Sequence, residues 1–104
     1  MPILQTFQLQ GKLALITGSS AGIGFALARA LGQAGAHVIL NGRHADKVAA
    51  AATTLQAEGL KVSQSVFDVT QAQDVAKAIH QIESDVGSIE ILINNAGMQI
   101  RGPL

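Results

Sequence analysis

Residues 16–24, ITGSSAGIG, hold the grouping best suited to binding chemistry in this chain. Gly18, Gly22 and Gly24 follow an apolar lead-in. Glycine permits a tight turn, and the lack of a Cβ lets a ligand approach the backbone closely. The N–H groups at the start of a helix attract an anion, because that end of the helix dipole is positive. The spacing therefore predicts a pyrophosphate-binding turn between a strand and a helix, with a ligand-free structural turn as the alternative.

The elements that would position this turn follow from the spacing of apolar residues. Short continuous apolar runs, typical of strands buried on both faces, cover residues 13–16, 38–40, 62–69 and 89–93. Apolar stripes with helical spacing, each followed by a glycine, cover residues 23–34, 48–55 and 75–86. This alternation predicts an α/β fold, a Rossmann-like doubly wound parallel sheet of four strands and three helices with helices on both faces.

Length and composition restrict the class of protein. The 104 residues suffice for one domain, and 48% hydrophobic with 13% charged residues indicates a buried core. Seven basic and seven acidic residues cancel, so the chain lacks the basic surface that nucleic-acid binding needs. There is no cysteine, no signal-peptide pattern and no apolar run long enough to span a membrane. We expect a cytoplasmic protein with no nucleic-acid or membrane partner.

The end of the second predicted strand indicates which dinucleotide would bind. In such sites an acidic side chain here holds the ribose 2′-OH of NAD, whereas an arginine accommodates the 2′-phosphate of NADP. Residues 41–44 read NGRH and contain no carboxylate. The guanidinium of Arg43 is permanently charged and suits a phosphate, so we favour NADP over NAD. The alternative is that Arg43 is a solvated loop residue.

TGSSAGIG at residues 17–24 and NNAG at residues 94–97 together resemble the short-chain dehydrogenase/reductase family. Each motif follows its own predicted strand, and the resemblance covers essentially the whole chain. It implies an oxidoreductase built on a Rossmann domain, with NADP as the cofactor that Arg43 favours. In its full-length form such a protein is expected to be a homo-oligomer.

The resemblance also implies a set of cofactor contacts. The residues implied to line the pyrophosphate are Gly18, Ser20, Ile23 and Gly24. Asp68 would accept a hydrogen bond from the adenine amino group, with Val69 beside it. The residues implied to support the central sheet and lie along the adenosine ribose are Asn95, Ala96 and Gly97. Many NADP-dependent members carry a basic residue where this chain has Ala21. Arg43, with His44 beside it, would therefore bind the 2′-phosphate.

Within the family, three segments are similar to gluconate 5-dehydrogenases, which interconvert D-gluconate and 5-keto-D-gluconate with NADP(H). These segments are residues 38–43, 57–70 and 89–104. Gln99 and Arg101 match the polar and basic pair that follows NNAG in that subgroup, and Arg101 would suit the carboxylate of a sugar acid. Ile100 departs from the subgroup, which would carry a second basic residue there. Related carbonyl reductases, including 3-oxoacyl carrier-protein reductases, are the alternative substrate class.

The family's catalytic serine, tyrosine and lysine lie downstream of NNAG, and this chain contains no tyrosine. No metal-ligand spacing is present. We therefore expect residues 1–104 to be a truncated single domain that supplies the cofactor-binding half of the enzyme and is inactive alone. The alternative is a complete product, either a stand-alone dinucleotide-binding module or an inactive remnant. In that case the apolar strand at 89–93 would form an exposed, self-pairing edge.

Overall fold

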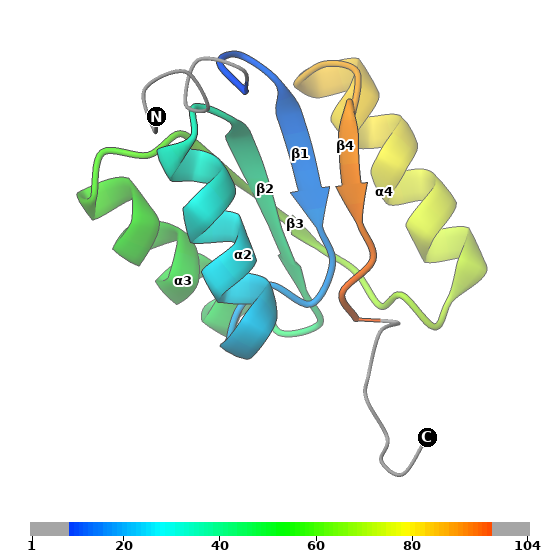
Figure 1. The fold of residues 1–104 in the computed structure, drawn as a ribbon. Helices are drawn as coiled ribbons and strands as arrows, with labels where there is room; N and C mark the ends of the chain where they lie inside the picture. The colour runs from blue at the N-terminus through cyan, green and yellow to red at the C-terminus, as the bar shows by residue number, and fades with distance from the viewer. Residues whose placement is uncertain (1–8, 97–104) are drawn as a thin grey trace, which may run out of the picture.

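The computed structural model describes residues 9–96, drawn as a ribbon in Figure 1. Its elements, in chain order, are β1 (Leu13–Ile16), α2 (Gly22–Gln33), β2 (His37–Gly42), α3 (Ala45–Ala57), β3 (Val62–Val66), α4 (Ala72–Asp85) and β4 (Ile91–Ile93). The described strands form one parallel sheet in the order β3-β2-β1-β4. The predicted α/β, Rossmann-like fold is confirmed.

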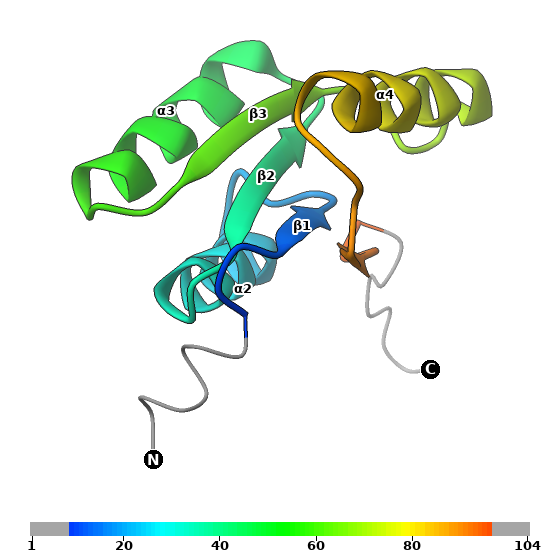
Figure 2. The same cartoon turned by 90° about the horizontal axis from the view of Figure 1, so that it is seen from above.

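Helices cover both faces of the sheet, with α2 and α3 on one side and α4 on the other (Figures 1 and 2). Alternate side chains of each strand point to opposite faces. Ile16 and Leu40 pack in the cluster beneath α2 and α3, whereas Leu15 and Ile39 pack with Ile82 of α4. All four residues of β1 are buried. This two-sided burial explains why the strands read as continuous apolar runs.

Each described helix ends just before a glycine, as the sequence predicts. Gly35, Gly59 and Gly87 have φ values of 107°, 87° and 151°. This left-handed backbone suits glycine and terminates a helix. Among residues 9–96, no helix has the length and apolar character that crossing a membrane requires.

Two strands are shorter than their apolar runs. β3 ends at Val66 rather than Val69, because the chain turns at Asp68, whose carboxylate accepts from the Thr70 N–H at 2.9 Å. β4 begins at Ile91, although the Glu90 N–H already donates to the Leu13 carbonyl at 2.9 Å. Both differences lie where a strand meets a turn that backbone or side-chain hydrogen bonds define.

β4 is incompletely covered. Leu92 pairs in register with Leu15 and so faces the side of the sheet that carries α4. Its side chain is nevertheless 57% exposed. The described residues therefore leave an apolar surface beside β4.

The inner face of α3 provides a test of this packing. Leu55 is fully buried on the inner face of α3, whereas Thr53 on the same helix is exposed. Leu55→Ala should lower the free energy of unfolding by about 2–5 kcal/mol, because it leaves a cavity in the core. Thr53→Ala should change it by less than about 0.5 kcal/mol. Chemical denaturation of the full-length protein measures both values, and equal losses would contradict the burial of this face.

Candidate cofactor-binding site

The carboxyl ends of the strands meet at one edge of the sheet and enclose a cavity of about 250 Å³. Its lining comes from the end of β2 and from the segments after β1, β2, β3 and β4, and consists of Gly18, Asn41, Arg43, Phe67, Asp68, Val69, Thr70 and Ala96. The chain winds in opposite directions from β1, through β2 on one side and β4 on the other. Such a reversal opens a crevice at the strand ends, where open α/β sheets bind ligands.

The glycine turn after β1 needs glycine for two different reasons. Gly18 has φ of 62°, a left-handed conformation that side chains disfavour. Gly24, in the first turn of α2, has no room for a side chain. A Cβ there would overlap the Gly18 carbonyl oxygen and lie 2.7 Å from Asn95 Nδ2. The helix therefore packs directly against the turn that precedes it.

No side chain of α2 caps the backbone N–H groups at its N-terminus or offsets their positive charge. Its N-cap, Ala21, makes no side-chain capping bond, and the first turn holds no acidic residue. In contrast, α3 and α4 carry Asp46 and Asp74 in their first turns. Ile23, in the first turn of α2, is 72% exposed. Because no carboxylate offsets the positive end of its dipole, this helix is suited to binding an anionic group.

The segment after β4 is hydrogen-bonded to the glycine turn that follows β1. Asn95 Nδ2 donates to the Gly18 carbonyl at 3.1 Å, and the Ala96 N–H donates to Thr17 Oγ1 at 3.1 Å. Thr17 Oγ1 in turn donates to Asn94 Oδ1 at 3.1 Å. The NNA segment thus fixes the glycine turn from the β4 side. Gly97, Gln99 and Arg101, which the sequence also marks as site residues, lie outside the described residues.

Arg43 follows β2 directly and lines the cavity. At the position before it, Gly42, there is no space for a carboxylate side chain. A Cβ on Gly42 would lie 2.9 Å from Val48 Cγ2 and 3.1 Å from Ser20 Oγ. Val48 is fully buried and cannot move aside readily. Ser20 therefore lies against the end of β2, beside the exposed Arg43.

Asp68 lies in the segment after β3 and lines the same cavity as Arg43. Its Oδ1 accepts from Thr70 Oγ1 at 2.7 Å and from the Thr70 N–H at 2.9 Å. These two bonds, with a smaller contribution from the positive charge of Arg43, lower the pKa of the Asp68 carboxyl. Asp68 is therefore an ionised hydrogen-bond acceptor at neutral pH.

Sequence reasoning found most of this edge but missed three polar residues that shape it. Asn41 and Ser19 are buried, and Thr70 holds Asp68. The sequence signal that could have identified Asn41 is its place as a polar residue directly after an apolar run. The predicted residues that the structure brings to the cavity lining are Gly18, Arg43, Asp68, Val69 and Ala96.

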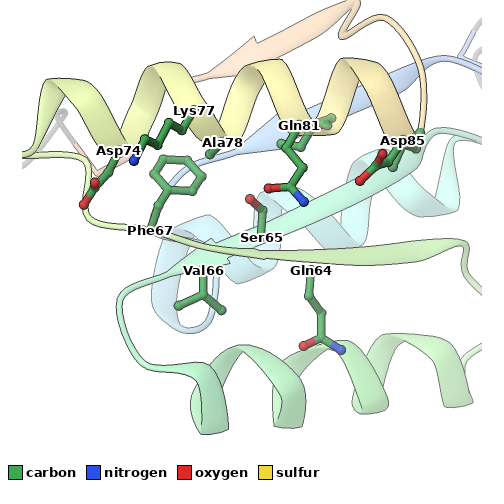
Figure 3. Close-up of a pocket in the computed structure, with 11 residues that line it drawn as sticks. Gln64, Ser65, Val66, Phe67, Asp74, Lys77, Ala78, Gln81 and Asp85 are labelled. Atoms are coloured by element: carbon green, nitrogen blue, oxygen red, sulfur yellow. The ribbon is translucent and has the colours of Figure 1, made fainter.

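A larger hollow of about 560 Å³ lies elsewhere, between β3 and α4 (Figure 3). Ser65 of β3 and Phe67, just after β3, point into it opposite Lys77 and Gln81 of α4. It contains none of the predicted site residues, and Asp74 and Asp85 outnumber its one cation. An anionic cofactor fits it poorly. Within residues 9–96, His, Asp and Glu side chains do not gather anywhere in groups of three that could hold a metal ion.

The fold is Rossmann-like, with a candidate site at the strand ends, and the comparison with known families agrees with this fold. Residues 12–104 match the short chain dehydrogenase family model, and the chain belongs to that family. The family predicted from TGSSAGIG and NNAG is confirmed.

Individual relatives resemble the chain closely. It is 52% identical to gluconate 5-dehydrogenase from Gluconobacter oxydans (strain 621H) over 98 residues, which are 94% of this chain and 38% of that protein. It is 44% identical to 5-keto-D-gluconate 5-reductase from Escherichia coli (strain K12) over 97 residues, 93% of this chain and 38% of that protein. The predicted resemblance to gluconate 5-dehydrogenases is confirmed. The chain spans little more than a third of the length of these relatives.

Solved structures give the same result. A gluconate 5-dehydrogenase from Burkholderia cenocepacia J2315, in complex with NADP and tartrate, superposes with a TM-score of 0.85 and 47% identity, covering 96% of this chain and 39% of that chain. L-Sorbose reductase from Gluconobacter frateurii, complexed with NADPH and L-sorbose, gives a TM-score of 0.81 and 38% identity, covering 88% of this chain and 35% of that chain.

The close packing of Gly24 predicts a specific sensitivity. Gly24→Ala should lower the free energy of unfolding by about 1–3 kcal/mol, because the added methyl group pushes the glycine turn and Asn95 aside. Gly32→Ala on the same helix is the matched control. Its Cβ would meet only the side chain of Leu60, whose nearest atom is the flexible Cδ1 at 3.0 Å. Thermal and chemical denaturation compare the two variants, and equal stability would show that the turn tolerates a Cβ.

The pKa of Asp68 provides a second test. A carboxyl whose pKa is lowered by folding adds stability above its ordinary value of 3.8, and this stability is lost as the pH falls through the lowered pKa. Thr70→Val removes the hydroxyl donor but keeps the N–H, so the Asp68 pKa should rise towards 3.8. NMR titration of the side-chain carboxyl carbon measures this shift. Thr53→Val is the control, and an unchanged Asp68 pKa in Thr70→Val would assign the shift to another group.

Proposed function

We propose that the full-length protein is an NADP-dependent oxidoreductase that interconverts a sugar acid and its keto form, as gluconate and 5-ketogluconate are interconverted. The chain supplies the cofactor-binding part. The observation that carries this proposal is the convergence of the glycine turn, Arg43 and the ionised Asp68 around one cavity at the strand ends. The names of the relatives support the substrate class.

The residues present fit an NADP molecule placed along this edge. The open N-terminus of α2 would receive the pyrophosphate, with the contacting residues proposed as Gly18, Ser20, Ile23 and Gly24. Asp68 would accept a hydrogen bond from the adenine amino group, with Val69 against the ring. Asn95, Ala96 and Gly97 would lie along the adenosine ribose. When bound, the nicotinamide supplies the hydride that reduces the carbonyl, or accepts it in the reverse direction.

The preference for NADP over NAD rests on charge and space together. Arg43 would pair with the 2′-phosphate, and Ser20 lies nearby against Gly42. A carboxylate at position 42, which could hold the 2′-OH of NAD, has no room beside Val48. Both features select the phosphorylated ribose.

Substrate binding and proton transfer are proposed for parts of the protein beyond the described residues. Gln99 and Arg101 would face the substrate, with Arg101 pairing with the carboxylate of a sugar acid. The serine, tyrosine and lysine of the family reaction would come from the rest of the full-length protein. That protein is proposed to be a cytoplasmic homo-oligomer, and the 104 residues alone to be inactive.

One experiment tests both cofactor and reaction. Full-length wild-type protein should oxidise NADPH in the presence of 5-keto-D-gluconate and use NADH poorly. Arg43→Ala should weaken NADPH binding about 10- to 100-fold, because a charged hydrogen-bonding partner is lost, and leave NADH binding nearly unchanged. Fluorescence titration gives the affinities, and NADPH absorbance gives the rate.

Arg29→Ala is the matched control. Arg29 of α2 is half-exposed and pairs at 2.8 Å with Glu58, the residue just after α3. Its loss removes the same charge without touching the cavity, so NADPH affinity should not change. Equal losses for NADPH and NADH in Arg43→Ala would refute the NADP assignment. Tight NADPH binding with no turnover of keto acids or other carbonyls would favour a binding module without catalysis.

A further inference from the structure

Asn41 lies one residue before the end of β2 and is only 1% exposed. Its side-chain amide reaches two different strand ends. Oδ1 accepts from the Gly18 N–H at 2.9 Å, while Nδ2 donates to the carbonyl of Ser65 at 3.1 Å and to that of Phe67 at 3.2 Å. A single amide therefore joins the glycine turn after β1 to the end of β3.

The backbone of Asn41 makes a second connection to the same turn. Its N–H donates to Ser19 Oγ at 2.9 Å, and its carbonyl accepts from the Ser19 N–H at 2.8 Å. Ser19 Oγ then donates to the Ile16 carbonyl at 2.7 Å. Ser19 is fully buried, so water cannot replace these bonds. Together, Asn41 and Ser19 continue the β1–β2 pairing beyond the last residue of β1.

These contacts decide the shape of the cavity rather than its chemistry. The Gly18 N–H points to Asn41, so Gly18 shapes the turn and the open N–H groups for an anion come from the residues that begin α2. On the other wall, the carbonyl held by Asn41 belongs to Phe67, the residue just before Asp68. Both walls of the cavity are thus tied to one buried side chain.

Only asparagine fits this position among side chains of its size. The site needs one acceptor for Gly18 and two donor hydrogens for the carbonyls of Ser65 and Phe67. An aspartate would keep the acceptor but place a second oxygen against two carbonyl oxygens. A leucine would leave all three backbone groups unpaired in a buried place.

We propose that Asn41 is a positioning residue that sets the separation between the glycine turn and the adenine side of the cavity. A ligand that spans both walls, from adenine to pyrophosphate, depends on this separation, whereas a ligand that touches one wall does not. The proposal rests on the proposed NADP-binding function. Asn41 is not proposed to touch the substrate or to take part in proton transfer.

The test compares a spanning ligand with a one-sided ligand in the full-length protein. NADPH spans both walls, and adenosine 2′-phosphate reaches only the adenine and Arg43 side. Asn41→Asp and Asn41→Leu should each weaken NADPH binding about tenfold or more and adenosine 2′-phosphate binding less than about threefold. Asn41→Leu is the decisive variant because it adds no charge, whereas the aspartate of Asn41→Asp would also repel the pyrophosphate that only NADPH carries.

Two further variants separate positioning from general loss of stability. Ser19→Ala removes the second connection and should also weaken NADPH binding more than adenosine 2′-phosphate binding, even if Asn41→Leu does not fold. Leu55→Val, a core substitution in α3, should lower the melting temperature without changing either affinity. In the cofactor-free protein, amide exchange at Gly18 should accelerate in Asn41→Leu but much less in Asn41→Asp, which keeps the acceptor.

The outcomes are distinct. A selective loss of NADPH affinity supports the positioning role. Equal losses for the two ligands, or no loss for either, overturn it while NADPH binding by the wild-type protein stands. Failure of the wild-type protein to bind NADPH overturns the proposed function itself, and the positioning role with it.

Discussion

Burial of β1 on both faces is the constraint on which the rest of the structure depends. β1 is paired with β2 on one edge and β4 on the other, and its four side chains contribute alternately to the two apolar clusters. A strand held in this way cannot shift its register, because a one-residue slip would exchange the side chains between the two faces. The position of the glycine turn is therefore fixed by the core.

The crevice at the strand ends follows from that fixed position. β2 and β4 lie on opposite sides of β1 in the sheet, so the segments after all four strands face one another across the end of β1. Backbone hydrogen bonding between the strands stops where the strands end. Beyond that point, polar groups make the hydrogen bonds that hold the segments together. Asn41, Ser19, Thr17 and Asn95 supply hydrogen bonds between different strand ends at this edge.

The sequence predicted the elements because apolar spacing reports which face of an element is buried. It did not report where α3 and α4 begin. Their first turns contain Asp46 and Asp74, and apolar periodicity carries no information over polar, exposed residues. Arg43 and Asp68 could be identified from their positions after predicted strands. Asn41 could not be recognised as a bridge, because its three partners are backbone groups brought together only by the β1, β2 and β3 register.

The strand order also has a consequence for synthesis of the protein on the ribosome. Pairing of β1 with β2, and of β2 with β3, joins segments separated by a single helix, whereas pairing of β1 with β4 must wait until Ile91–Ile93 emerges. Nearby segments pair early because the loop that they close is short. For that interval the nascent chain carries β1, its most deeply buried strand, as an open edge. An unpaired edge of this kind can pair with other chains, so the arrival of β4 removes a route to aggregation as well as completing the sheet.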